Sequence, residues 1–92
     1  MPKYLVAYDL VGDETPREYE RLIDEIKKLD DYVEVQRSVW LIKTSHSAKE
    51  VRELLWSYMD RNDRLMVIRI VRGSAWRNAL SGNPPLKKFL AD

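Results

Sequence analysis

Residues 3–22 read KYLVAYDLVGDETPREYERL and pass within a few positions from an apolar strand pattern into a charged helix pattern. In the first seven, side chains alternate, with Leu5, Ala7 and Asp9 on one face and residues 4, 6 and 8 on the other. Both faces are largely apolar, as in a strand from the middle of a sheet. The stretch therefore predicts a central strand over residues 3–9 that ends on an acid, Asp9.

A helix start follows directly. Thr15 is the predicted N-cap, Pro16 the first helical residue, and Glu18 stands three positions after the cap. The hydroxyl and the carboxylate can each bond an orphan backbone N–H, which is a capping box. Apolar side chains then recur at helical spacing, at residues 19, 22, 23, 26 and 29. We expect an amphipathic helix that ends near Leu29 or Asp30.

The rest of the chain continues in the same manner. Residues 32–43 (YVEVQRSVWLIK) hold two strand patterns, joined at residues 36–38 by a tight hairpin or by a bend in one long strand. Ser47 and Glu50 form a second capping box before an apolar helical stripe, and residues 65–71 (LMVIRIV) form another strand pattern. The order strand, helix, strand, strand, helix, strand predicts an α+β, ferredoxin-like fold, with an antiparallel sheet and two helices on one face.

We place this ferredoxin-like domain at residues 1–73 and a C-terminal tail at residues 74–92. Gly82 to Pro85 should break regular structure and residues 86–90 (LKKFL) favour a last helical turn. A fifth strand and a dimer-contacting segment both remain open for the tail. The strands carry more large apolar side chains than two helices on one face should cover, so we expect some to meet the tail or a second subunit, and we expect a dimer. These side chains are Tyr4, Val6, Tyr8, Trp40 and Ile42.

The composition indicates one small domain. Of 92 residues, 45% are apolar and 34% charged, and no apolar run approaches the roughly 20 residues that a bilayer requires. The N-terminus lacks a signal-peptide pattern, so we expect a cytoplasmic protein with no membrane partner. The absence of cysteine excludes disulfides and thiolate chemistry.

Charge is unevenly distributed. Residues 1–60 carry 9 Lys and Arg against 13 Asp and Glu, whereas residues 61–92 carry 7 against 2. The basic end, which includes Trp76, could contact the phosphates and bases of a nucleic acid. The alternative is that its charges are simply solvated on an exposed tail.

The acids are the candidates for chemistry. His46 is the only histidine and has no second histidine or cysteine near it, and the serines lack a histidine and acid framework. The scattered glycines argue against a phosphate-binding loop or a dinucleotide fold. Magnesium and manganese prefer carboxylate oxygens, and two copies of Asp9 across a dimer axis would hold one such ion, which could activate water against a phosphodiester. From spacing alone, an acid at a strand end is more often a turn former.

Several of these segments together resemble the small CRISPR-associated adaptation proteins of the Cas-two family and their VapD-like relatives. The strand ending in Tyr8-Asp9 and the later segment with Gln36, Ser38, Val39 and Trp40 carry the resemblance, which covers about residues 3–76. It implies a ferredoxin-like homodimer in which the two Asp9 carboxylates face each other. Asp9 would then be the catalytic and metal-binding residue of a magnesium- or manganese-dependent endonuclease acting on RNA or DNA, with Tyr8 and Ser38 near the site.

The same resemblance also implies a non-catalytic alternative. In CRISPR adaptation such a dimer is a scaffold that holds duplex DNA between integrase subunits, so the partners would be nucleic acid and a CRISPR integrase subunit, or another protein. Arg37, Arg69, Arg72 and Arg77 are the candidate nucleic-acid contacts. The chain departs from the family in the acids of GDETPRE (residues 12–18), where relatives often carry arginines, and this charge repels phosphates. A divergent branch of the family is therefore expected. A third reading, a domain that binds a small regulatory ligand, has no residue signature.

Overall fold

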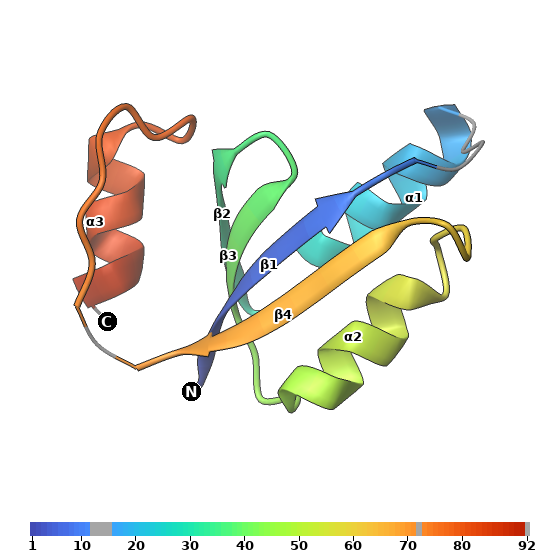
Figure 1. Cartoon of the computed structure of the whole chain (residues 1–92). Coiled ribbons are helices and arrows are strands. Elements are labelled where there is room, and N and C mark those ends of the chain that lie inside the picture. Colours follow the sequence, from blue (N-terminus) through green and yellow to red (C-terminus); the bar gives the residue numbers. More distant parts are fainter. Residues whose placement is uncertain (12–15, 72, 92) are drawn as a thin grey trace.

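The computed structural model describes residues 1–11, 16–71 and 73–91 and contains four strands and three helices within them (Figure 1). The order of elements expected from the sequence is found as far as the fourth strand, and a third helix follows. The predicted N-cap Thr15 lies outside the described residues. The elements are β1 (Lys3–Asp9), α1 (Pro16–Lys27), β2 (Asp31–Gln36), β3 (Val39–Lys43), α2 (Ala48–Trp56), β4 (Arg64–Ile70) and α3 (Asn83–Ala91).

The four strands form one antiparallel sheet in the order β2-β3-β1-β4. β1 is therefore a central strand, as its two apolar faces predict. Leu5 stands opposite Leu41 of β3 on one side and opposite Ile68 of β4 on the other. These pairs place the odd-numbered side chains of β1 on one face of the sheet, which we call the second face, and the even-numbered ones on the opposite face, which we call the helix face.

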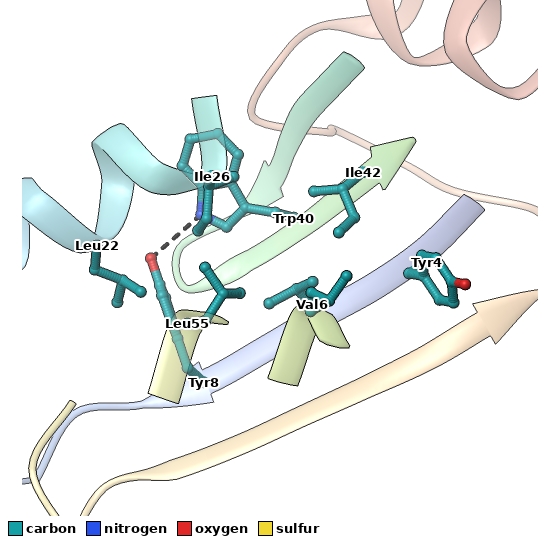
Figure 2. Packing of buried hydrophobic residues seen from close by; sticks show 9 residues of the cluster. Tyr4, Val6, Tyr8, Leu22, Ile26, Trp40, Ile42 and Leu55 are labelled. Atoms are coloured by element: carbon teal, nitrogen blue, oxygen red, sulfur yellow. Dashed lines mark hydrogen bonds between the residues drawn. The ribbon is translucent and has the colours of Figure 1, made fainter. Parts of the chain in front are cut away.

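α1 and α2 cover the helix face (Figure 1). Leu22 and Ile26 of α1 and Val51 and Leu55 of α2 are buried against it. We expected that some of the large side chains on the strands would need the tail or a second subunit, and for the five listed above this is wrong. The apolar side chains of α1 and α2 cover all five, which are buried in this one cluster (Figure 2): Tyr4, Val6, Tyr8, Trp40 and Ile42.

The tail instead covers the second face. α3 lies on the side of the sheet away from α1 and α2, where Leu86 and Phe89 are buried against Val33 and Leu41 (Figure 1). The ammonium groups of Lys3 and Lys43 lie over the Phe89 ring, 5.8 and 5.2 Å from its centroid. Lys3 Nζ also donates to the Leu90 carbonyl at 3.2 Å, so a cation satisfies a free carbonyl at the helix end.

The expectations for the tail need correction. We allowed for a fifth strand and for a single helical turn after a break at Gly82 to Pro85, but the chain forms a nine-residue helix that includes both prolines. Proline is tolerated in the first turn of a helix, because the amide hydrogens there have no partner within the helix. Pro84 and Pro85 therefore lie where a helix begins. Residues 73–82 form no strand.

The structure settles two local features, the connection between β2 and β3 and the start of α2. β2 and β3 form a tight hairpin through Arg37 and Ser38, and Ser38 adopts a left-handed conformation with φ of 62°. The capping box of α2 is confirmed: Glu50 N–H donates to Ser47 Oγ at 3.1 Å, and Ser47 N–H donates to Glu50 Oε1 at 2.9 Å.

We predict that Phe89→Ala lowers the free energy of unfolding by about 3 kcal/mol, since it opens a cavity under α3 where the ring is 2% exposed. Urea denaturation measures this change. Leu80→Ala is the control, because Leu80 is 55% exposed and its truncation should change stability little. Equal midpoints for the two variants would show that α3 does not stabilise the fold.

We also predict unequal effects of two substitutions at Ser38. Valine is β-branched and should cost about 1–3 kcal/mol at this left-handed position, whereas glycine adopts it without strain. The thermal unfolding midpoint of Ser38→Val should thus lie below that of the wild type, and the midpoint of Ser38→Gly should lie at or above it. A Ser38→Val protein as stable as the wild type would exclude the left-handed turn.

Candidate functional site at the end of β1

Asp9 is the last residue of β1 and lies on the second face of the sheet, exposed to solvent. Its Oδ2 accepts a hydrogen bond from Nη1 of Arg64 at 2.8 Å. The two residues stand directly opposite each other in the β1–β4 register, so the sheet itself brings them together. The side chains are 60% and 73% exposed, and such an ion pair contributes at most about 1 kcal/mol to stability.

A second acid, Asp63, fixes the chain beside this pair. Its carboxylate is buried, with Oδ1 accepting from Val11 N–H at 2.8 Å and Oδ2 accepting from Asp60 N–H at 2.7 Å. Asp63 thus ties the chain that leaves β1 to the turn that leads into β4. Our sequence reasoning missed this residue and the pairing of Arg64 with Asp9. The signal available was weak, an acid within the charged turn at residues 60–64.

Tyr8 belongs to the opposite face. Its hydroxyl accepts a hydrogen bond from Trp40 Nε1 at 3.2 Å inside the core, and Figure 2 shows both side chains among the buried residues. Burial raises the pKa of the Tyr8 phenol well above its ordinary value of 10, and the hydrogen bond from Trp40 opposes this only in part. The phenol therefore stays protonated and points away from Asp9. Ser38 is close to β1 through its backbone, since its carbonyl accepts a hydrogen bond from Tyr8 N–H at 3.0 Å.

The described candidate nucleic-acid contacts lie on different elements of the fold. Arg69 stands opposite Tyr4 and so belongs to the helix face, whereas Asp9 is on the second face. Arg37 is exposed in the hairpin turn, and Arg77 is exposed in the segment between β4 and α3. Arg72 lies outside the described residues.

An apolar patch adjoins Asp9 on the second face. Ala7, Met66 and Ile68 form it, and the last two are 50% and 49% exposed because α3 packs on the other part of this face. A shallow hollow of about 260 Å³ at its border is lined in part by Ala7, Asp9, Arg64 and Met66. β4 is an edge strand of the sheet, so one side of its backbone is not paired within the sheet.

Asp9 contributes one carboxylate toward a metal site. Within residues 1–11, 16–71 and 73–91, no cluster of three or more His, Asp or Glu side chains is placed to hold a metal ion. Mg²⁺ is commonly held by one or two carboxylates with waters and substrate phosphates. Asp9 of one chain supplies one such carboxylate, and Asp9 of a second copy would supply the other.

The comparison with models of known protein families finds no match for this chain. None of the helices in the described part is long and apolar enough to cross a membrane.

We predict that Asp9→Asn changes the free energy of unfolding by less than about 1 kcal/mol, because it weakens only an exposed ion pair. Asp63→Asn should cost about 1.5–3 kcal/mol, since an amide oxygen can replace only one of the two buried acceptors. Urea denaturation of both variants at pH 7 tests the contrast. A larger loss for Asp9→Asn than for Asp63→Asn would contradict these assignments.

Proposed function

We propose that the protein is a homodimer of the Cas-two-like or VapD-like kind, with a ferredoxin-like fold, and that it is a metal-dependent endonuclease for RNA or DNA. The Asp9 carboxylates of the two subunits would together bind one shared magnesium or manganese ion. The observation that carries the proposal is the position of Asp9: an exposed carboxylate at the end of a central strand, at the border of an uncovered apolar patch.

The patch supports pairing of two copies. Met66 and Ile68 are large apolar side chains on an edge strand, and burying them requires something outside this chain's own elements. A second copy that covers the patch around a two-fold axis contacts it with the same residues, because such interfaces are self-complementary. Asp9 borders the patch, so both copies of Asp9 would lie at the interface.

Asp9 and Arg64 would have different roles toward a magnesium or manganese ion. When bound, such an ion supplies an activated water and charge stabilisation at a phosphodiester. The two Asp9 carboxylates would hold the ion, and Arg64 would first have to release Asp9 Oδ2. Because the pair is exposed and weak, this release costs little.

A second function is favoured by the same ion pair. Asp9 is already paired with Arg64, and within the described residues no group of three or more His, Asp or Glu side chains is placed to hold a metal ion. A non-catalytic dimer that scaffolds nucleic acid, with a CRISPR integrase subunit or another protein as partner, needs only the exposed basic side chains and no ion at Asp9.

For the nuclease, we predict that Asp9→Asn lowers the rate of Mg²⁺-dependent cleavage of labelled RNA or duplex DNA by about 100-fold or more, since the ion contributes several kcal/mol to the transition state. Arg64→Gln should lower the Mg²⁺ concentration needed for half-maximal cleavage, because it removes the competing cation. Asp24→Asn, an exposed acid on α1, is the matched control and should cleave like the wild type.

The two functions separate in this experiment. Equal cleavage by wild type and Asp9→Asn would remove Asp9 from the mechanism. Binding without cleavage by any variant, with an affinity that falls as salt rises, would establish the scaffold instead.

A further inference from the structure

A second hollow lies on the same face of the sheet as Asp9, between the sheet and the segment that connects β4 to α3. Its volume is about 350 Å³, at the lower end of the range for small-molecule sites. Leu5, Val39 and Leu41 from the sheet and Leu86 and Leu90 from α3 give it an apolar lining. Asp9 and Arg64 do not line it, so this is a separate site.

The connecting segment is held over the sheet at defined points. Gly73 and Asn78 adopt left-handed conformations, with φ of 78° and 56°, and both residue types tolerate this region. Leu80 N–H then donates to the Val35 carbonyl at 2.9 Å, which fastens the segment to β2. The wall that residues 73–77 form is therefore a built part of the fold.

Polar and aromatic groups stand at this wall. Trp76 lines the hollow and is 39% exposed, and its Nε1 donates to Asn83 Oδ1 at 3.1 Å. This bond orients the indole without burying it. Arg77 also lines the hollow, is exposed, and has no salt bridge to any carboxylate in the described parts of the chain. Gln36 adds an amide, which both donates and accepts hydrogen bonds.

These groups together select a ligand. An apolar lining beside a tryptophan suits a flat ring, because a base or other aromatic ring stacks on the indole. A guanidinium without a carboxylate partner suits a phosphate, which it binds through two donors. The surrounding part of the chain, residues 61–92, has 7 Lys and Arg against 2 Asp and Glu and attracts anions.

We propose that this hollow, between Trp76, Arg77 and the second face of the sheet, is a nucleotide site that takes one unpaired base with its phosphate. The base lies against Trp76 over the apolar lining, and Arg77 binds the phosphate. The nucleotide belongs either to a single strand or to a free mononucleotide, since the two share this chemistry. A base within a duplex does not fit, because its faces are already stacked. The site is independent of Asp9 and does not require catalysis.

The test is a fluorescence titration of the full chain with AMP and UMP, with single-stranded oligonucleotides six residues long, and with a duplex of matched sequence. Nucleotide should quench the tryptophan emission of the wild type and of Trp56→Phe, but not that of Trp76→Phe. Trp56 is the matched control, because it is 37% exposed and lies on α2, away from the hollow.

Two further variants change the site itself. Ala75→Phe fills the hollow from an exposed position of its wall, and Arg77→Gln removes the phosphate contact. Each should weaken binding about tenfold, as loss of one stacked base or one phosphate contact does. Arg61→Gln, an exposed arginine in the turn before β4, should bind like the wild type. Urea denaturation of each variant shows that the fold is retained.

The outcomes distinguish the sources and the two proposals. Binding of mononucleotides identifies a free nucleotide as sufficient, and binding of oligonucleotides alone identifies a strand; both support the site. Asp9→Asn should bind normally, so a protein that binds nucleotide without cleaving anything would retain the site and lose the nuclease. Wild-type affinity in Ala75→Phe and Arg77→Gln, absence of quenching at millimolar nucleotide, or equal binding of the duplex would overturn the inference.

Discussion

The structure depends on the double-sided apolar character of β1. Tyr4, Val6 and Tyr8 on one face and Leu5 on the other all have to leave water, and each large apolar side chain buried contributes about 1.5–3 kcal/mol. A central strand of this kind cannot be satisfied by helices on one side of the sheet alone. The chain therefore builds three layers, with α1 and α2 on the helix face and α3 on the second face. The tail is part of the fold and not an appendage to it.

Much of this arrangement could be predicted from local pattern. The alternation in residues 3–9 separates the two faces correctly, and the second capping box marks the start of α2 to the residue. α3 was underestimated because Pro84 and Pro85 suggest a break, although a helix accepts proline in its first turn. The hairpin carries no glycine, so its left-handed residue, Ser38, has no signal in the sequence. Which face the helices cover also cannot be read from β1, since both of its faces are apolar.

The candidate site divides in the same way. The place of Asp9 at a strand end could be predicted, because an acid ends an apolar strand pattern in the sequence itself. Its partner Arg64 lies 55 positions away and is determined by the register between β1 and β4, which no local pattern contains. Asp63 was equally hidden, since an acid in a charged turn becomes informative only when its two oxygens are seen to accept backbone hydrogens. The hollow beside Trp76 depends on a loop that crosses the sheet, so it too had no signature in the sequence.

The proposed dimer places a definite constraint on Asp9. Two carboxylates brought together at an interface repel each other unless cations accompany them, and covering the apolar patch strengthens every charge interaction there by excluding water. With two copies of Arg64 present, two Asp9 carboxylates are already balanced, so the interface can form without metal. A divalent ion would then add excess positive charge, unless the arginines move away or an anion enters with the ion. The phosphate of a nucleic acid is such an anion. In the proposed dimer, metal and substrate would therefore enter the site together, and the Asp9–Arg64 pair would be the closed form of that site.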